Sequence, residues 1–192
     1  MNNVGFTYIS SLEEMSDKEA REEFDINIFG VLNATRNVLP RMRKQRSGHI
    51  FNMSSLGAYN VEPLFGIYCA TKHALKVISE TLAQEVKQFG IHVTDVKSGF
   101  MRTEFFGSSY KTTSPKDSPY KNLYDENMKF YIWKSNWRPK KGAKLYIEVA
   151  EMENPYESLP MGTDSCDGIK DICEKITKLM GEMRDISKKT NY

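Results

Sequence analysis

The chain has 192 residues, about one domain, and its 40% hydrophobic and 27% charged residues are typical of a globular protein rather than a disordered one. Its formal net charge is only +2 with the two signs interleaved, which argues against nucleic acid or an anionic membrane as a partner. No run of about 18 apolar residues occurs, and the opening MNNVGFTYISS lacks the basic and apolar blocks of a secretory signal, so we expect a cytoplasmic protein.

The first predicted element is a helix from Ser16 to Met42. Ser16, with Glu19 three residues later, forms a capping box, which is typical of a helix start. Pro40 and the basic residues that follow it are expected to close the helix. The apolar period within it is kept by Phe24, Ile28, Val31, Leu32, Thr35 and Leu39.

The next elements alternate strand, helix and strand. HIFNMS, from His49, reads as a short buried strand, and IHVTDV, from Ile91, reads as another. The helix between them is predicted from Ile67 to Phe89, with Gly90 placed to end it. Its predicted inner stripe consists of Ala70, Ala74, Val77, Ile78, Thr81 and Leu82. This alternation favours parallel crossover units and therefore an α/β fold.

Residues 107–140 lack a clean period, and a long irregular stretch inside a domain is often a lid. Its aromatic residues could line an apolar substrate pocket or merely pack against the sheet: Tyr120, Tyr124, Phe130, Trp133 and Trp137. A helix near Lys141 to Met152, a short strand SLPMG and a final helix complete the chain, which we expect to form one domain over residues 1–192.

Tyr68 and Lys72 lie four residues apart near the start of the second helix, so they share one helix face. An amphipathic surface helix would explain a bare YxxxK pattern just as well. Three further features favour a site. Ser55 ends a predicted strand, where ligands bind in open α/β sheets. Asn27 interrupts the apolar face of the first helix, and NNVG and SGFMRT place glycines at predicted strand ends.

In this order and spacing, the motifs resemble the short-chain dehydrogenase/reductase family over nearly the whole chain. The family pattern of NNAG, an Asn in the next helix, Ser, YxxxK and PGxxxT is matched by Asn2 to Gly5, Asn27, Ser55, Tyr68 with Lys72, and Ser98 to Thr103. The resemblance implies the carboxyl-terminal part of a Rossmann-type, doubly wound parallel sheet with flanking helices.

The resemblance also implies the chemistry, an oxidoreductase that interconverts a small-molecule carbonyl and an alcohol with NAD or NADP. Tyr68 would be the general acid/base, Ser55 would hold the substrate oxygen, and Asn27 would hold a water in the proton relay. Lys72 would bind the nicotinamide ribose and lower the pKa of Tyr68. The remaining cofactor contacts would come from Asn3, Gly5, Gly99 and Thr103.

One lysine suffices for that tuning on paper. Lowering a phenol from a pKa near 10 to about 7 needs roughly 4 kcal/mol. An ammonium about 4 Å away, at an effective dielectric of about 20, supplies roughly that much.

The family pattern is broken at its start, because no TGxxxGxG turn is found in the 192 residues. That turn carries the cofactor phosphates, and the residue that selects NAD or NADP is missing with it. We therefore expect a shortened chain that binds cofactor weakly or not at all and is marginally stable. Val4 replaces the usual Ala and Ser98 the usual Pro, and neither change removes a catalytic group.

Two alternatives stay open at this point. The chain could be a non-catalytic interaction protein that keeps the fold's core. The family resemblance also implies a homo-oligomer through the two long helices, whose outer faces carry Arg36, Lys76 and Glu80, as plain solvated faces also would. No metal site is expected, because three cysteines without CxxC spacing and three scattered histidines form no ligand set.

Overall fold

The computed structural model describes residues 1–100, 109–113, 115–133 and 139–190. Its centre is a parallel three-stranded sheet of β2 (Gly48–Met53), β3 (Ile91–Ser98) and β5 (Ser158–Met161), in the order β2-β3-β5. Asn2 forms a parallel bridge to Asn52, so the opening segment runs along the free edge of β2. A parallel sheet flanked by helices confirms the predicted α/β class.

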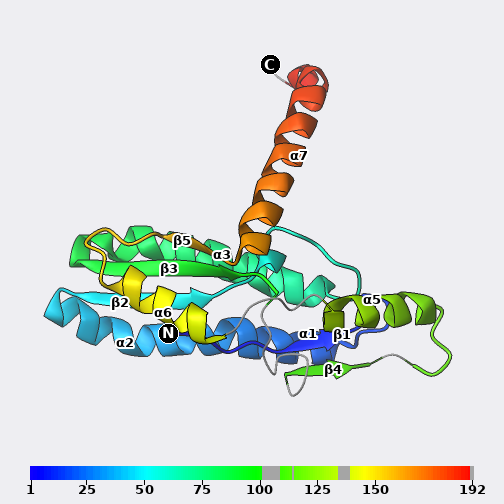
Figure 1. The fold of residues 1–192 in the computed structure, drawn as a ribbon, viewed down its shortest axis with the longest axis horizontal. Helices are drawn as coiled ribbons and strands as arrows, with labels where there is room; N and C mark the ends of the chain where they lie inside the picture. Colours follow the sequence, from blue (N-terminus) through cyan, green and yellow to red (C-terminus); the bar gives the residue numbers. More distant parts are fainter. Residues whose placement is uncertain (101–108, 114, 134–138, 191–192) are drawn as a thin grey trace.

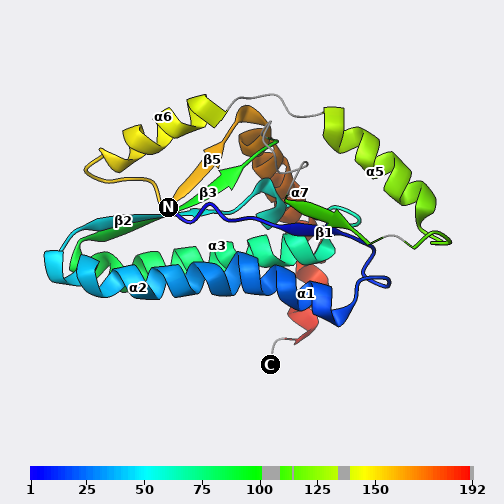
Figure 2. The ribbon, with the colours of Figure 1, turned by 90° about the horizontal axis from the view of Figure 1, so that it is seen from below.

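Helices cover both faces of this sheet (Figure 2). On one face lie α1 (Asp17–Phe24), α2 (Gly30–Gln45) and α3 (Gly66–Val86), and on the other lies α6 (Pro139–Ala150). Ile50 and Val93 pack toward α3, whereas Phe51 and Val96 pack toward α6. This alternation follows from the two-residue period of a strand, and it confirms HIFNMS and IHVTDV as buried strands.

The first predicted helix is confirmed at its start and interrupted in its middle. Ser16 and Glu19 form the predicted capping box. A π-helical turn over Asp25–Phe29 then separates α1 from α2, and it contains Asn27. Pro40 lies inside α2 and does not end it. The helix ends instead where Arg46 turns into the left-handed region, at φ 55.

The predicted inner stripe of α3 was wrong in its register. Val77 is 58% exposed, and Ala70 and Thr81 are exposed as well. The buried face includes polar residues, because the structure offers each of them a partner. Ser79 bonds Asn52 and the Leu75 carbonyl, for instance. The buried residues of α3 are Cys69, Thr71, Lys72, Leu75, Ser79, Ala83 and Val86.

The described part of residues 107–140 is more regular than expected. It contains β4 (Tyr110–Thr112), which pairs in parallel with β1 (Thr7–Ile9), and α5 (Lys121–Trp133). Tyr124 is buried in a cluster with Ile9 and Phe65, so for this aromatic residue the packing alternative is correct. Trp137 lies outside the described residues, and a lid over a substrate stays a prediction.

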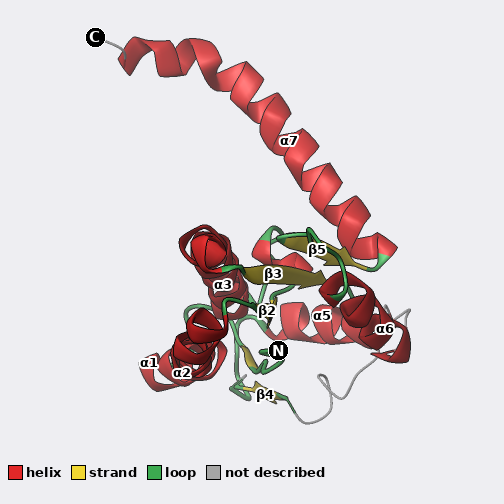
Figure 3. Cartoon of the chain, turned by 90° about the vertical axis from the view of Figure 1, so that its left-hand side faces the viewer, coloured by secondary structure: helices red, strands yellow, loops and turns green. Residues whose placement is uncertain are grey.

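The last long helix, α7 (Thr163–Ser187), leaves the body of the molecule and projects away from it (Figure 1). Figure 3 shows its carboxyl end far beyond the sheet and the helices that flank it. None of the helices in the described ranges is both long and apolar enough to cross a membrane.

Candidate active site

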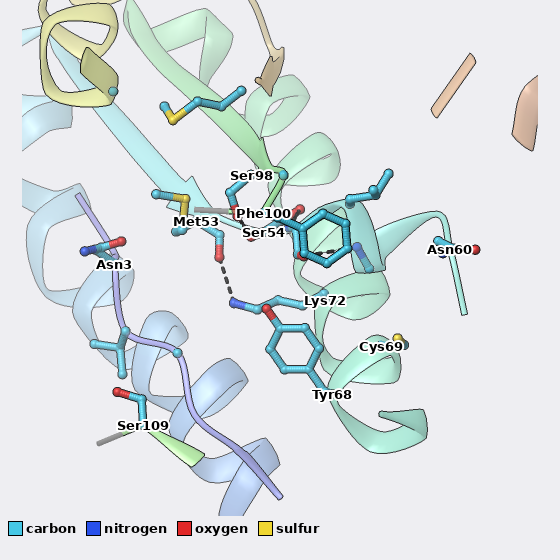
Figure 4. Close-up of a pocket in the computed structure, with 18 of the residues that line it drawn as sticks. Asn3, Met53, Ser54, Asn60, Tyr68, Cys69, Lys72, Ser98, Phe100 and Ser109 are labelled. Carbon is cyan, nitrogen blue, oxygen red and sulfur yellow. Dashed lines mark hydrogen bonds between the residues drawn. The ribbon is translucent and has the colours of Figure 1, made fainter. Parts of the chain in front are cut away.

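A cavity of about 540 Å³ opens at the carboxyl ends of β2 and β3 (Figure 4). In an open α/β sheet this is the edge at which ligands bind. Its walls come from the opening segment, the loop after β2, the first turns of α3, the end of β3 and α6. The predicted site residues among its lining are Asn3, Gly5, Ser55, Tyr68, Lys72 and Gly99.

Tyr68 and Lys72 lie on successive turns at the start of α3, and both reach the cavity. The Nζ atom of Lys72 lies 5.5 Å from the centre of the Tyr68 ring. It donates a hydrogen bond of 2.9 Å to the backbone carbonyl of Met53, at the end of β2 (Figure 4). An ammonium has three donors, so this bond fixes the lysine and leaves donor capacity for a ligand.

Ser55 lies directly after β2 and joins the same group. Its hydroxyl oxygen accepts a 3.0 Å hydrogen bond from the backbone N–H of Gly57, which caps the short 3₁₀ turn Leu56–Ala58. A hydrogen bond with the Ser55 side chain also acts on the Tyr68 phenol. The serine, the tyrosine and the lysine thus converge on one cavity from two separate elements.

Asn27 lies behind this group, outside the cavity lining, and is fully buried. Its amide nitrogen donates to the Phe6 carbonyl at 2.8 Å and to the Thr71 hydroxyl at 3.1 Å, and its oxygen accepts from the Phe6 N–H at 3.0 Å. Thr71 in turn donates to the Tyr68 carbonyl at 2.7 Å. Both amide donors are therefore used in holding the opening segment and α3 together, and the water expected on Asn27 stays a prediction.

Two of the expected cofactor contacts depend on the loop after β3. Gly99 lines the cavity, whereas Thr103 lies outside the described residues. The Gly99 N–H bonds the Met161 carbonyl at 3.0 Å, and the Phe100 N–H donates to the carboxylate of Asp164 at 2.6 Å. Asp164, in the first turn of α7, was missed by the sequence reading because 65 residues separate it from Gly99 along the chain.

This loop gives a direct stability prediction. A Cβ added at Gly99 would overlap the Asp164 carboxylate, so Gly99→Ala should lower the free energy of unfolding by about 1–3 kcal/mol, the usual cost of overpacking. The matched control is Gly181→Ala in α7, where an added Cβ has no neighbour within 4 Å. Urea unfolding measures both variants, and equal midpoints for Gly99→Ala and the native chain would contradict the contact.

The titration of the site differs from the sequence prediction. Burial raises the pKa of the Tyr68 phenol above its ordinary value of 10.0, and the hydrogen bond with Ser55 only partly opposes this. Burial also lowers the pKa of Lys72 to about 8, against the opposing pull of Asp95 and Glu23. The expected acidification of the phenol by Lys72 was therefore wrong for the unliganded chain, because desolvation of both groups outweighs their attraction.

Glu23 is a buried carboxyl group that the sequence reading missed. It is fully buried, and one of its oxygens accepts the Tyr8 N–H at 3.1 Å. The other oxygen has no hydrogen-bond partner within the described residues. Burial raises the pKa of Glu23 to about 7, and its charge acts on both Lys72 and Tyr68. In the sequence, Glu23 reads as one more charge on an amphipathic helix.

Comparison with known proteins identifies the class. Residues 1–114 match the family described as short chain dehydrogenase. The oxidoreductase BOA17 of Botryotinia fuckeliana is 29% identical over 190 residues, which cover 97% of this chain and 69% of that protein. An uncharacterized oxidoreductase of Schizosaccharomyces pombe is 30% identical over 164 residues, or 84% of this chain and 69% of that protein.

A solved structure agrees with these relatives. A short-chain dehydrogenase from Streptomyces avermitilis has a TM-score of 0.89 and 31% identity to this chain, and the match covers 99% of this chain and 70% of that one. The chain therefore belongs to the short chain dehydrogenase family, and it is an oxidoreductase of that type. The resemblance read from the motifs is confirmed.

Proposed function

We propose that the cavity is the active site of a nicotinamide-dependent oxidoreductase that interconverts a carbonyl and an alcohol on a small-molecule substrate. The observation that carries this proposal is the convergence of Ser55, Tyr68 and Lys72 on one cavity at the carboxyl edge of the sheet. A hydroxyl, a phenol and an ammonium together can hold an oxygen, transfer a proton and stabilise the resulting charge.

The roles follow from the positions of the three groups. Ser55 holds the substrate oxygen through its hydroxyl, which also bonds the phenol. Tyr68 gives its proton to a carbonyl oxygen in reduction and takes it from an alcohol in oxidation. Lys72, fixed by the Met53 carbonyl, places its ammonium beside the phenol, where a cation favours the phenolate. Asn27 keeps the first turn of α3 in place through Thr71.

NAD or NADP would supply or accept the hydride in this reaction. The nicotinamide end fits the residues that are present, because Lys72 keeps donors for ribose hydroxyls and Asn3, Gly5 and Gly99 line the same cavity. The glycine-rich turn that would hold the phosphates is not found in the 192 residues. Neither is the residue that selects NAD or NADP.

The experiment supplies that phosphate-binding part. The amino-terminal segment of the Streptomyces avermitilis short-chain dehydrogenase, up to the counterpart of Met1, is fused before these 192 residues. The fusion is then tested for oxidation of NADH and NADPH with a panel of ketones and aldehydes. We expect turnover with at least one carbonyl. A folded fusion that binds cofactor but turns over neither carbonyls nor alcohols would reject the proposal.

Cofactor binding by the 192-residue chain itself is expected to be weak. Without the phosphate cradle, only the contacts at the nicotinamide end are available, so calorimetry should show no NADH or NADPH binding tighter than about 100 µM, or roughly 5.5 kcal/mol. Micromolar binding to this chain would show that the described cavity holds the dinucleotide without a glycine-rich turn.

The two long helices give a proposal about assembly. We propose that the outward faces of α2 and α3 pair with the same faces of a second copy. Val38 on α2 and Val77 on α3 are 41% and 58% exposed, and Phe29 at the start of α2 is 51% exposed. Such apolar exposure favours a partner more than the solvated face expected from Lys76 and Glu80, which pair with each other at 3.1 Å.

A further inference from the structure

The outer two thirds of α7 are free of the rest of the described chain. The helix is anchored at its start, where the buried Ser165 hydroxyl donates to the Lys97 carbonyl at 2.7 Å and Gly168 lies against Leu56. Every residue from 173 to 189 is exposed. Figures 1 and 3 show this part of the helix standing away from the sheet and its flanking helices. A helix in this position would normally present polar residues on all sides.

One face of α7 is instead apolar with a strict spacing. Its members follow one another at steps of three, four, three, four and three residues: Ile169, Ile172, Ile176, Leu179, Met183 and Ile186. This alternation is the a/d pattern of a coiled coil, and we call these six residues the α7 seam. Ile176, Leu179 and Ile186 are 52%, 48% and 61% exposed.

The charged residues lie off the seam. Lys170 and Glu174 form one pair along the helix, and Lys178 and Glu182 form another, each at 3.9 Å. Charges on the flanks and isoleucine, leucine and methionine in a line are the distribution of a helix that packs against another helix.

We propose that the α7 seam pairs with the same seam of a second copy of this chain, in an antiparallel two-stranded coiled coil. In that arrangement a and d positions alternate across the interface. Ile169 then faces Ile186 of the second copy, Ile172 faces Met183, and Ile176 faces Leu179. A two-fold axis repeats each layer, so all six seam residues are used without a gap.

Charge decides the direction of the pairing. Lys175 and Glu182 occupy the g positions that flank the seam, and in an antiparallel pair each g position lies near a g position of the other helix. Lys175 of one copy therefore meets Glu182 of the other, twice. In a parallel pair, Lys175 would face Met180 and Glu182 would face Ser187, and no ion pair would form. The complementary charges favour a second copy of α7 over an unrelated helix.

The length of the seam sets the expected strength. Seventeen residues from Ile169 to Ile186 span about 26 Å at roughly 1.5 Å per residue. A helix of this length is marginal in isolation, although α7 is already formed and anchored at Ser165. We expect a dissociation constant of about 1–100 µM, so the association should depend on concentration in an accessible range.

Sedimentation velocity of the 192-residue chain across that range tests the seam. Ile176→Lys should weaken the association by about tenfold or more, because it buries an unpaired charge in the central layer. Thr177→Lys, which introduces the same residue one position outside the seam, should behave as the native chain. A native chain that stays monomeric at about 100 µM would overturn the proposal. Equal association of Ile176→Lys and the native chain would also overturn it, and would assign any dimer to another surface.

Charge exchange tests the direction. Lys175→Glu and Glu182→Lys should each weaken the pair through like-charge contacts, whereas the double variant should restore it. Lys170→Glu, the same change outside the seam, is the control and should have no effect. Circular dichroism confirms that each variant keeps its helix. If the seam matters but the single and double charge variants are indistinguishable, the antiparallel arrangement is wrong.

Discussion

Tyr68→Phe is expected to lower the kcat of the fusion described above by about 10² to 10⁴, the usual contribution of a general acid or base. The phenyl ring keeps the packing of α3 against Phe65 and removes only the hydroxyl. Because Lys72 and the other contacts at the nicotinamide end stay in place, the Kd for cofactor should change little. Steady-state kinetics measures the first effect, and fluorescence titration of NADPH measures the second.

The control for this substitution is Tyr156→Phe, which removes a phenol that is 60% exposed and does not line the cavity. It should leave kcat and the cofactor Kd unchanged. A Tyr68→Phe enzyme with more than about a tenth of native turnover would contradict the role of Tyr68 as proton donor. Loss of cofactor binding along with turnover would instead indicate a structural defect.

The unfavourable ionisation of the unliganded site is consistent with this role. Burial keeps the Tyr68 proton on the phenol at neutral pH, and a neutral phenol is the form that can donate to a carbonyl oxygen. Lys72, with its pKa lowered to about 8, holds a charge that is only marginally stable. A ligand that brings hydroxyl acceptors to the ammonium would favour its charged form, and the phenolate would be favoured with it. The acid and base functions of the site are thus coupled to ligand binding.

The sequence predicted the parts of this fold that depend on local pattern. The capping box at Ser16, the two buried strands and the YxxxK pair all follow from residue type and spacing, and each is found where it was expected. The register of α3 did not follow, because Thr71 and Lys72 read as polar and are buried against partners from distant elements. No residue-type rule anticipates a carbonyl acceptor such as that of Met53.

Buried charge marks the other limit of the sequence reading. Asp95 and Lys97 lie in β3, both fully buried, and form an ion pair of 2.8 Å under α3. A strand predicted from alternation gives no sign that two charged residues would share its inner face. Asp164 and Glu23 were missed for a related reason, since the environment of each is built by segments far away in the chain.

Glu23→Gln is expected to stabilise the protein above pH 7 by up to about 3 kcal/mol and to have little effect near pH 4.5. The pKa of Glu23 is 4.5 in its ordinary state and about 7 in the folded chain, where burial disfavours the carboxylate. Between these values the folded state binds more protons than the unfolded state, so Glu23 makes stability fall as pH rises through that window. A shift of roughly 2.5 units at about 1.36 kcal/mol per unit gives the stated magnitude.

The readout is the difference between native and variant free energies of unfolding at each pH, obtained from urea titrations. The difference is needed because burial lowers the pKa of His49 to about 4, which makes stability rise with pH from about 4 to its ordinary 6.5 and opposes Glu23. His49 is present in both proteins and cancels. Glutamine keeps an oxygen that can accept the Tyr8 N–H, so the backbone contact is retained.

The neighbouring carboxylate is the matched control. Glu22 is partly exposed, and its pKa is lowered, chiefly by the hydrogen bond from the Tyr8 hydroxyl at 2.7 Å. Its folded pKa is depressed, so it contributes stability above its ordinary pKa that is lost as pH falls. Glu22→Gln should therefore destabilise at neutral pH, the opposite sign to Glu23→Gln. If both changes shift stability in the same direction at pH 8, Glu23 does not carry a buried, unfavourable charge beside Lys72.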